Sequence, residues 1–398
     1  MSSSEVFVPI PKPHDGQLEA LKQFKRFTVL ANGRRWGKSL LCERQAALAA
    51  LHGLHVAYIA PNYQMVSSWW RNMITRLGGA SKHISNVHHK MTLYSGGSIS
   101  CFSMDAPNSI RGNSFDVVWI DEAAFAPNLK DVWDNVIRPT LLDRRGKARF
   151  ISSPNGFNDF WSLAQNQDSQ DDWVTIQMPT WTNPYIPKDE IEIFKRQMPS
   201  WVYDAEIGAQ FVEMKSGLFR KDWIKKLDIQ DIPGGLDIYF GVDLAISKKD
   251  HADFTCIAAL AKDHATGCSY LLGLHRSRMS MSETISQIKQ MSQYWNPVTI
   301  AIETVAYQRA IVDEILETTE LPVQAVTPKG DKVQRALPLA AAFEHGDIYL
   351  ADSALVDPEL YNELTAFPST KMHDDCIDAV ALALLASVGQ QNIFAFSI

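Results

Sequence analysis

The sequence lacks several features that would assign it to particular classes of protein. It has no apolar run long enough to span a bilayer and no signal-peptide start, so we expect a soluble, intracellular protein without a membrane contact. Its five cysteines show no paired short spacing, which argues against both a zinc site and a disulfide framework. No internal repeat or low-complexity tract interrupts the chain. What remains is a globular protein of 398 residues, long enough for two domains with a core each.

The charge is distributed unevenly along the chain. Residues 1–100 hold 12 Lys and Arg against 4 Asp and Glu, whereas residues 213–398 hold 16 against 25. The formal net charge of −7 conceals this asymmetry. An acidic enzyme can still bind a phosphate backbone through a local basic surface while it gathers carboxylates around metal ions. The composition therefore permits DNA as a partner and does not demonstrate it.

The run from Asn32 to Ser39 nearly matches a phosphate-binding loop. In such a loop glycines let backbone N–H groups surround the phosphates, a lysine reaches the outer phosphates and a hydroxyl meets Mg²⁺. Gly37, Lys38 and Ser39 fill the last three of these positions, and Gly33 lies within the loop. Asn32 stands where the first glycine is usual, and asparagine tolerates left-handed backbone better than most residues.

The flanking segments fit this interpretation. Residues 27–31 form a short apolar run typical of a buried strand, and residues 40–51 have the pattern of a helix whose N-terminus would face the phosphates. The alternative is a surface turn rich in Gly and Lys that matches the motif by chance.

A second motif supports nucleotide chemistry. Residues 117–120 are apolar throughout, as in a strand buried on both faces, and Asp121 and Glu122 follow directly. At such a strand end Asp121 can hold Mg²⁺ through water, and Glu122 can polarise the attacking water. Alone, the pair would be an ordinary strand end. Together with the loop, it predicts a domain that hydrolyses ATP with Mg²⁺.

The first half of the chain alternates strand-like and helix-like segments, which predicts a P-loop NTPase domain of three α/β/α layers around a mostly parallel sheet. These segments are residues 56–60, 65–77, 98–102, 117–120, 129–142 and 149–152. We expect the ATPase domain to cover residues 1–212. A linker over residues 213–235 is predicted because Gly and Pro punctuate the sequence there.

The second half, residues 236–398, has a different order. It opens with three strand-like runs, 238–243, 254–260 and 269–274. Their short connections predict an antiparallel meander. A helix near 282–294, a strand over 298–303 and further alternation lead to a final helix from about 375 to 388. This order is that of a ribonuclease-H-like domain, so the predicted fold class is α/β in both halves.

Carboxylates occupy three positions of this half. Asp243 ends the first strand and Glu303 the fourth, while Asp374 and Asp375 begin the last helix, with Asp378 one turn on. Side chains at such places can converge, and two divalent metals, Mg²⁺ or Mn²⁺, held by them would cleave a phosphodiester. Separately, each is explained as a turn residue, a solvated strand end or a helix cap. Periodicity does not choose between Asp374 and Asp375 as the ligand.

These motifs, in this order, resemble those of the large terminase subunit of tailed bacteriophages, the motor and nuclease that packages double-stranded DNA into a procapsid. The resemblance covers nearly the whole chain. It implies ATP-driven translocation of double-stranded DNA and endonucleolytic cleavage of concatemeric DNA.

The resemblance also implies roles for residues that the spacing leaves unexplained. Arg34 and Arg35 match an arginine thought to stabilise the transferring phosphate in cis, and Arg111 matches one that would reach a neighbouring subunit's ATP. As alternatives, these arginines simply bind phosphate or pair with nearby carboxylates. Ser153 and Asn155 resemble the family's coupling motif and would sense the outer phosphate.

Two further elements follow from the same resemblance. His14 with Gln17 resembles the element that reads adenine, and a glutamine can pair with the adenine edge through two hydrogen bonds. Lys329, Lys332 and Arg335 would hold the DNA backbone beside the metal cluster, although an ordinary charged helix face has the same composition.

The implied partners are double-stranded DNA, a portal protein, a small terminase subunit and the procapsid. The implied state is a monomer in solution that forms a homo-oligomeric ring at the portal vertex, in the host cytoplasm. Two alternatives stay open: a helicase or repair translocase fused to a ribonuclease-H-like nuclease, and an inactive scaffold with these folds. The lack of an extended second motor domain between residues 215 and 235 argues against the helicase, and the intact motif residues argue against the scaffold.

Overall fold

The structure is a computed structural model, and it describes most of the chain. The described residues are 7–168, 171–213, 217–245, 254–304, 309–328, 330–353, 355–356, 358–369 and 373–389. They divide into two compact units. The first comprises Met1–Phe194 and Ser200–Met214, and the second comprises Lys195–Pro199 and Lys215–Ile398.

The first unit begins with a short helix and then alternates strands and helices. Its elements are α1 (Asp15–Gln23), β1 (Phe27–Asn32), α2 (Lys38–Leu51), β2 (His55–Ala60), α3 (Tyr63–Leu77), β3 (Ser81–Ser85), β4 (Lys90–Leu93), β5 (Ser98–Ser103), β6 (Val117–Asp121), α4 (Leu129–Val132), β7 (Lys147–Ser152), α5 (Asp159–Ala164), β8 (Trp173–Met178), α6 (Lys188–Gln197), whose last three residues belong to the second unit, and α7 (Ser200–Glu206).

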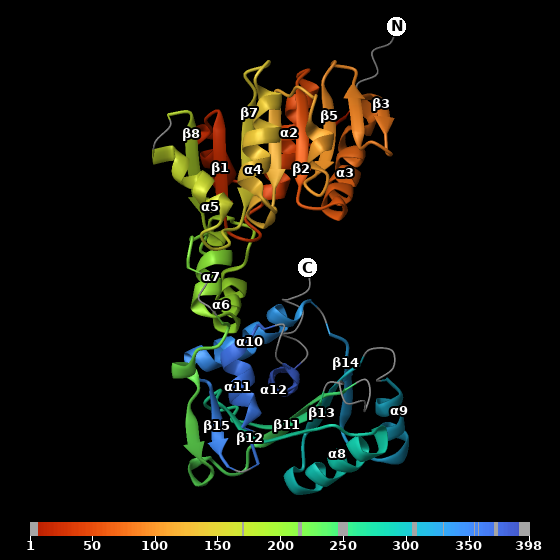
Figure 1. Ribbon diagram of the computed structural model, residues 1–398, viewed down its shortest axis with the longest axis vertical. Coiled ribbons are helices and arrows are strands. Elements are labelled where there is room, and N and C mark those ends of the chain that lie inside the picture. The colour runs from red at the N-terminus through yellow and green to blue at the C-terminus, as the bar shows by residue number, and fades with distance from the viewer. Residues whose placement is uncertain are drawn as a thin grey trace. The chain divides into compact units, whose positions relative to one another are not determined.

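One eight-stranded sheet organises this unit, in the order β3-β4-β5-β2-β6-β7-β1-β8. Figure 1 shows β8 and β1 at one end of the sheet and β3 at the other. The strands β5, β2, β6, β7, β1 and β8, adjacent in this order, run parallel to one another. At the other end of the sheet, β3 pairs antiparallel with β4, and β4 pairs antiparallel with β5. Parallel strands carry their carboxyl ends to the same edge, so the loops after β1, β6, β7 and β8 meet there.

Both faces of this sheet are covered. Along β1, Val29 and Ala31 pack into one hydrophobic core, and Leu30 packs into a second core with residues of α2 and α3. Successive side chains of a strand point to opposite faces, so the unbroken apolar character of β1 requires a layer on each side. The predicted three-layer α/β/α class is confirmed.

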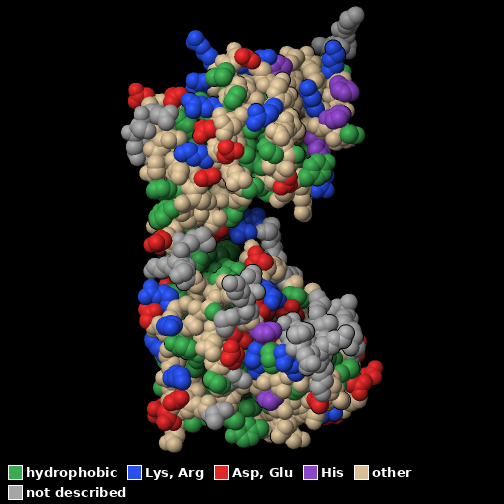
Figure 2. Space-filling model, in the orientation of Figure 1, with side chains coloured by type: hydrophobic (Ala, Val, Ile, Leu, Met, Phe, Trp, Pro, Cys, Tyr) green, Lys and Arg blue, Asp and Glu red, His purple; other side chains and the backbone are tan. Residues whose placement is uncertain are grey.

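Two parts of this unit differ from the sequence prediction. The predicted helix over residues 129–142 is α4 followed by a π turn (Trp133–Ile137) and a 3-10 turn (Arg138–Leu141), because Pro139 has no N–H for a regular helix. The β3–β4 hairpin was not predicted. Figure 2 shows basic and histidine side chains gathered over this end of the sheet, where Lys82, His83 and Lys90 are exposed.

The second unit contains the remaining elements. They are β9 (Lys226–Asp228), β10 (Asp237–Asp243), β11 (Thr255–Lys262), β12 (Ser269–Ser277), α8 (Met281–Trp295), β13 (Thr299–Glu303), α9 (Arg309–Thr318), β14 (Val323–Val326), α10 (Lys332–His345), β15 (Ile348–Asp352), α11 (Glu359–Ala366) and α12 (Asp375–Ser387).

These strands form a seven-stranded sheet in the order β14-β13-β10-β11-β12-β15-β9. The predicted antiparallel meander is confirmed, since β10, β11 and β12 pair antiparallel while β13 joins β10 in parallel. Part of the predicted linker, residues 213–235, is instead structured: β9 pairs in parallel with β15 and forms the edge of the sheet. The Gly and Pro signals there mark turns beside a strand too short to predict by alternation.

Gly241, in the middle of β10, lets α12 pack directly on the sheet. A Cβ atom at Gly241 would overlap the backbone carbonyl oxygen of Ala379 and the backbone nitrogen of Ala383. This close approach brings the first turn of α12 to the end of β10, where Asp243 lies.

Among the described residues, no helix is long and apolar enough to cross a membrane.

We expect Gly241→Ala to destabilise the second unit by about 1–3 kcal/mol, because helix backbone cannot move aside as a flexible side chain can. Urea denaturation followed by circular dichroism measures the change. Gly234→Ala is the matched control, since nothing lies within 4 Å of its added methyl group, and it should change stability by less than about 0.5 kcal/mol. Equal stability of the two variants would contradict the role of Gly241.

Candidate active sites

Lys38 closes the phosphate-binding loop between β1 and α2. Its Nζ donates to the carbonyl oxygens of Asn32 at 2.8 Å and Gly33 at 3.0 Å, and to the hydroxyl of Ser153 at 3.2 Å. The side chain is buried, and burial lowers the pKa of the ammonium, against the charge of nearby Glu122, which raises it. This ammonium is held at the edge of the sheet where phosphate oxygens would replace its present oxygen partners.

The loop itself is held from outside, by α1 and by the segment after β8. The bonds are Gly33 N–H to Met178 O (3.0 Å), Thr180 Oγ1 to Arg34 O (2.7 Å), Asn183 Nδ2 to Arg35 O (2.9 Å), His14 Nε2 with Trp36 O (3.0 Å) and Gln17 Nε2 to Gly37 O (2.9 Å). Gly37 has φ 99°, a backbone conformation that glycine adopts without strain. These hydrogen bonds fix the backbone of the loop, which lowers the entropy lost when phosphate binds.

Asp121 and Glu122 differ sharply in their surroundings. Asp121 is buried at the end of β6, and its carboxylate accepts hydrogen bonds from the Tyr58 hydroxyl and the Glu122 N–H, both at 2.9 Å. Burial and the neighbouring charge of Glu122 raise the pKa of Asp121 to about 6. Glu122 has left-handed backbone, with φ 44°, and accepts from the Ser152 hydroxyl at 3.1 Å. Strain of this kind at a non-glycine residue is typical of functional sites.

The end of β7 links these groups. Ser152 holds Glu122, and the next residue, Ser153, accepts from Lys38. A displacement at Lys38 or Glu122 would therefore reach β7 directly. Sequence reasoning selected Ser153 and Asn155 and missed Ser152, although all three lie in one Ser-Ser-Pro-Asn run. Asn155 is partly buried in the loop after β7.

Four further predicted residues of this site are exposed. Arg34, Arg35 and Ser39 lie on the loop and the first turn of α2, and Arg35 has left-handed backbone with φ 62°. Arg111 follows a short 3-10 turn, and its Nε donates to Asn108 Oδ1 at 3.1 Å. Their roles towards a nucleotide stay predictions.

Gln17 lies against the loop. Its Oε1 accepts from the His14 N–H at 3.2 Å while its Nε2 donates to Gly37, and the residue is 2% exposed. Its contact with adenine stays a prediction. Trp36, for which the sequence suggested no role, is fully buried and donates to Thr182 Oγ1 at 2.8 Å, so it anchors the loop.

In the second unit, carboxylates gather where β10, β13 and α12 meet. Asp243 ends β10, Glu303 ends β13, and Asp375 and Asp378 lie on the first turn of α12. Burial, followed by the charges of Asp378, Glu303 and Asp375, raises the pKa of Asp243 well above its usual range. Negative charges this close together favour a bound cation.

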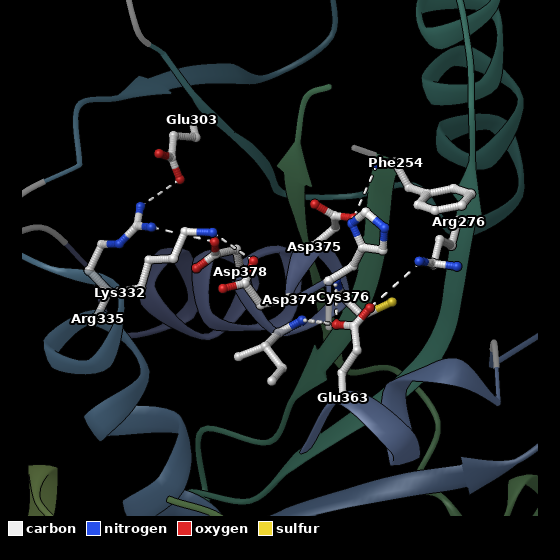
Figure 3. A network of polar contacts seen from close by, with 12 residues as sticks. Phe254, Arg276, Glu303, Lys332, Arg335, Glu363, Asp374, Asp375, Cys376 and Asp378 are labelled. Carbon is white, nitrogen blue, oxygen red and sulfur yellow. Dashed lines mark hydrogen bonds and ion pairs between the residues drawn. The ribbon is translucent and has the colours of Figure 1, made fainter. Parts of the chain in front are cut away.

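Two cationic side chains of α10 contact these carboxylates (Figure 3). The contacts are Arg335 Nη1 to Glu303 Oε2 (2.8 Å), Arg335 Nη2 to Asp378 Oδ2 (3.4 Å) and Lys332 Nζ to Asp374 Oδ1 (2.6 Å). Lys332 and Arg335 therefore lie beside the acidic cluster, where the sequence predicted a DNA contact. Lys329, the third predicted member of this set, lies outside the described residues.

The aspartates at the start of α12, between which the sequence did not choose a metal ligand, differ in their contacts. The carboxylate of Asp374 accepts a hydrogen bond from the Lys332 ammonium. Asp375 is buried and accepts from the Phe254 N–H at 3.1 Å. Asp378 is also buried, and burial raises its pKa to about 6, against Arg335, which lowers it. The site prediction omitted Asp378, although a residue three positions after Asp375 shares its helix face.

Glu363 of α11 supports this turn and was not predicted from the sequence. Its Oε2 accepts from the backbone N–H groups of Cys376 at 2.9 Å and Ile377 at 3.3 Å, and its Oε1 lies 3.6 Å from Arg276 Nε (Figure 3). Burial raises the pKa of Glu363 to about 7, and its bond to Cys376 opposes this. A carboxylate at a helix N-terminus satisfies backbone donors, so Glu363 fixes the orientation of α12.

Within the described part of the chain, no group of three or more His, Cys, Asp or Glu side chains is already arranged to hold a metal ion. The donor set nevertheless fits divalent metals. Asp243, Glu303, Asp375 and Asp378 supply hard oxygen ligands, which Mg²⁺ and Mn²⁺ prefer. The guanidinium of Arg335 contacts two of these carboxylates, Glu303 and Asp378, and offsets part of their charge.

Fold and sites together define a class: a P-loop ATPase domain and a ribonuclease-H-like nuclease domain in one chain. Family models agree in both units. The model described as "Terminase large subunit, T4likevirus-type, N-terminal" matches residues 29–226, and "Terminase RNaseH-like domain" matches residues 240–387. The chain belongs to the family of terminase large subunits.

Individual relatives are distant. The large terminase subunit of Escherichia phage T5 is 25% identical over 62% of this chain and 58% of its own length. That of Thermus phage G20c is 23% identical over 94% of this chain and 87% of its own. The chain thus spans little more than half of the T5 protein. A large terminase from a thermophilic bacteriophage, solved in complex with ADP, has 12% identity and a TM-score of 0.53, covering 94% of this chain and 99% of that one. This likeness shows a shared fold.

We expect the affinity for Mg·ADP to fall as the pH drops through about 6, because Asp121, with its pKa raised to about 6, then gains a proton and loses the charge that would hold Mg²⁺. Below pH 6 the loss should approach roughly tenfold per pH unit. Calorimetric titration between pH 5 and 8 measures it. Asp121→Asn should bind weakly with little pH dependence, and a wild-type affinity that stays constant down to pH 5 would contradict the assignment.

We expect Asp378→Asn to lower the rate of plasmid cleavage about a hundredfold and Asp374→Asn by less than about tenfold, because only Asp378 lies among the buried carboxylates. Initial rates with Mn²⁺ measure the difference, and circular dichroism checks that both variants fold. The opposite order of the two variants would make Asp374 the ligand.

Proposed function

We propose that this protein is an ATP-driven motor that moves double-stranded DNA into a procapsid and a two-metal nuclease that cuts concatemeric DNA. The observation that carries the proposal is the presence of both sites in one chain of the terminase family. One is the Lys38 loop beside Asp121 and Glu122, and the other is the carboxylate cluster around Asp243.

At the ATPase site, we assign the roles by the position of each residue in the two motifs. The loop and Lys38 bind the phosphates, Ser39 and Asp121 hold Mg²⁺, and Glu122, oriented by Ser152, accepts the proton of the attacking water. A large terminase of the same fold was solved in complex with ADP, which supports adenine nucleotide binding by this chain. An arginine at Arg34, Arg35 or Arg111 would stabilise the transition state, since guanidinium matches the oxygens of a transferring phosphate.

At the nuclease site, Asp243, Glu303, Asp375 and Asp378 hold the metals. Two divalent ions would activate water and stabilise the leaving oxygen. Arg335 and Lys332 lie beside these carboxylates and offer donors to the phosphates of the DNA, whose approach would otherwise be opposed by the acidic cluster. Binding of the backbone is expected to be independent of sequence and sensitive to salt.

The assembly proposed for this function follows the family. The protein is a monomer in solution and forms a ring on the portal protein, at the procapsid vertex in the host cytoplasm. A small terminase subunit selects the DNA to be packaged.

Two substitutions separate the activities. Wild type should relax or linearise supercoiled plasmid with Mn²⁺, and Asp243→Ala should lose this activity about a hundredfold or more because an acidic ligand is gone. Lys38→Ala should still cut the plasmid but lose ATP hydrolysis by a similar factor. Phosphate release and gel electrophoresis measure the two reactions. If all three proteins cut equally, a contaminant is the nuclease, and if none cuts, the nuclease proposal loses its support.

A further inference from the structure

The order of the strands indicates which way a bound nucleotide would lie along the carboxyl edge of the first sheet. Across the carboxyl edge of the first sheet, β6 carries Asp121, β7 leads to Ser153, β1 leads into the phosphate loop, and β8 follows on the other side. Asp121, Glu122 and Ser153 mark the outer-phosphate end. The sugar and base of a nucleotide bound as proposed above therefore extend past β1, toward the residues that follow β8.

An exposed aromatic ring stands at that end. Tyr185 is 76% exposed, and its ring lies edge-on to His14 with centroids 6.5 Å apart. Its backbone N–H donates to Asn183 Oδ1 at 3.0 Å, and the same Asn183 side chain donates to Arg35 O in the loop. The Asn183 side chain therefore links the backbone of Tyr185 to the phosphate loop. The other exposed aromatic of this segment, Trp181, stacks with Tyr203 of α7.

The glutamine expected to read the base is occupied elsewhere. Gln17 uses its amide to hold Gly37 and to cap α1, and its 2% exposure leaves its remaining hydrogen-bonding capacity out of reach of a ligand. Reading a base edge requires both amide groups to face the base. In this structure Gln17 supports the loop, whereas Tyr185 offers a ring face to solvent.

We propose that Tyr185 holds the nucleotide base by stacking, and that the site consequently discriminates weakly between adenine and guanine. This inference rests on the proposed ATPase function and deepens it. Stacking on an aromatic side chain tolerates every base, because each base has a π face. A site that reads a base through buried hydrogen bonds instead rejects the wrong base by several orders of magnitude.

Calorimetric titration of the whole protein with Mg·ADP and with Mg·GDP tests the proposal. Wild type should bind the two within about tenfold of each other, and Tyr185→Ala should weaken both about tenfold. Tyr185→Phe should retain the wild-type affinities, because the ring is kept. Tyr94→Ala is the matched control: Tyr94 is 75% exposed in the same unit, beyond β4 at the other end of the sheet, and its removal should change neither affinity.

Three results would overturn the stacking proposal: unchanged affinities in Tyr185→Ala, a preference of wild type for ADP of about a thousandfold or more, or a Gln17→Ala variant that loses ADP affinity and keeps GDP affinity. Lys38→Ala distinguishes this failure from failure of the function itself. If Lys38→Ala binds Mg·ADP as wild type does, the nucleotide does not occupy this loop, and the ATPase proposal and the stacking proposal both fail. If Lys38→Ala loses Mg·ADP binding and Tyr185→Ala keeps it, the ATPase proposal stands and the stacking proposal is wrong.

Discussion

Negative charge buried at the carboxyl ends of strands is the constraint on which both halves of this protein depend. Asp121 ends β6 and is buried beside Glu122, and Asp243 ends β10, partly buried among Glu303, Asp375 and Asp378. Burial disfavours the charged form of a carboxyl group, and a second carboxylate nearby disfavours it further. Such a cluster is tolerable in a folded protein only when cations are placed against it.

The two domains meet this constraint in different ways. In the ATPase domain the cation is Lys38, at the start of α2, and its ammonium is held by backbone carbonyl oxygens and by Ser153. In the nuclease domain Arg335 connects Glu303 with Asp378. Both arrangements leave the acids in a state that a divalent ion can stabilise, since the ion supplies the charge that the protein provides only in part. The same excess of acid that disfavours the charged carboxylates would favour a divalent ion at either site.

Neighbouring elements hold the functional groups of both sites in position. In the ATPase domain, hydrogen bonds from α1 and from the segment after β8 fix the backbone of the phosphate loop. In the nuclease domain, Glu363 holds the N-terminus of α12, and Gly241 allows that helix to lie directly on β10. Each support is a hydrogen bond at least partly shielded from water or a close backbone contact, so it limits how far the functional groups can move.

The sequence by itself determined the local signals: the phosphate loop, the Asp121-Glu122 strand end, the meander and the order of the acidic positions. Each depends on residue type and on spacing within a few positions. Only the tertiary structure decided that β9 joins the nuclease sheet, that Asp378 faces the acidic cluster while Asp374 turns to Lys332, and that Gln17 holds the loop. Those outcomes depend on contacts between residues far apart in the chain, such as Asn183 with Arg35 and Arg335 with Glu303. Packing alone selects such partners, because a pattern along the sequence states which side chains are available and not which of them meet.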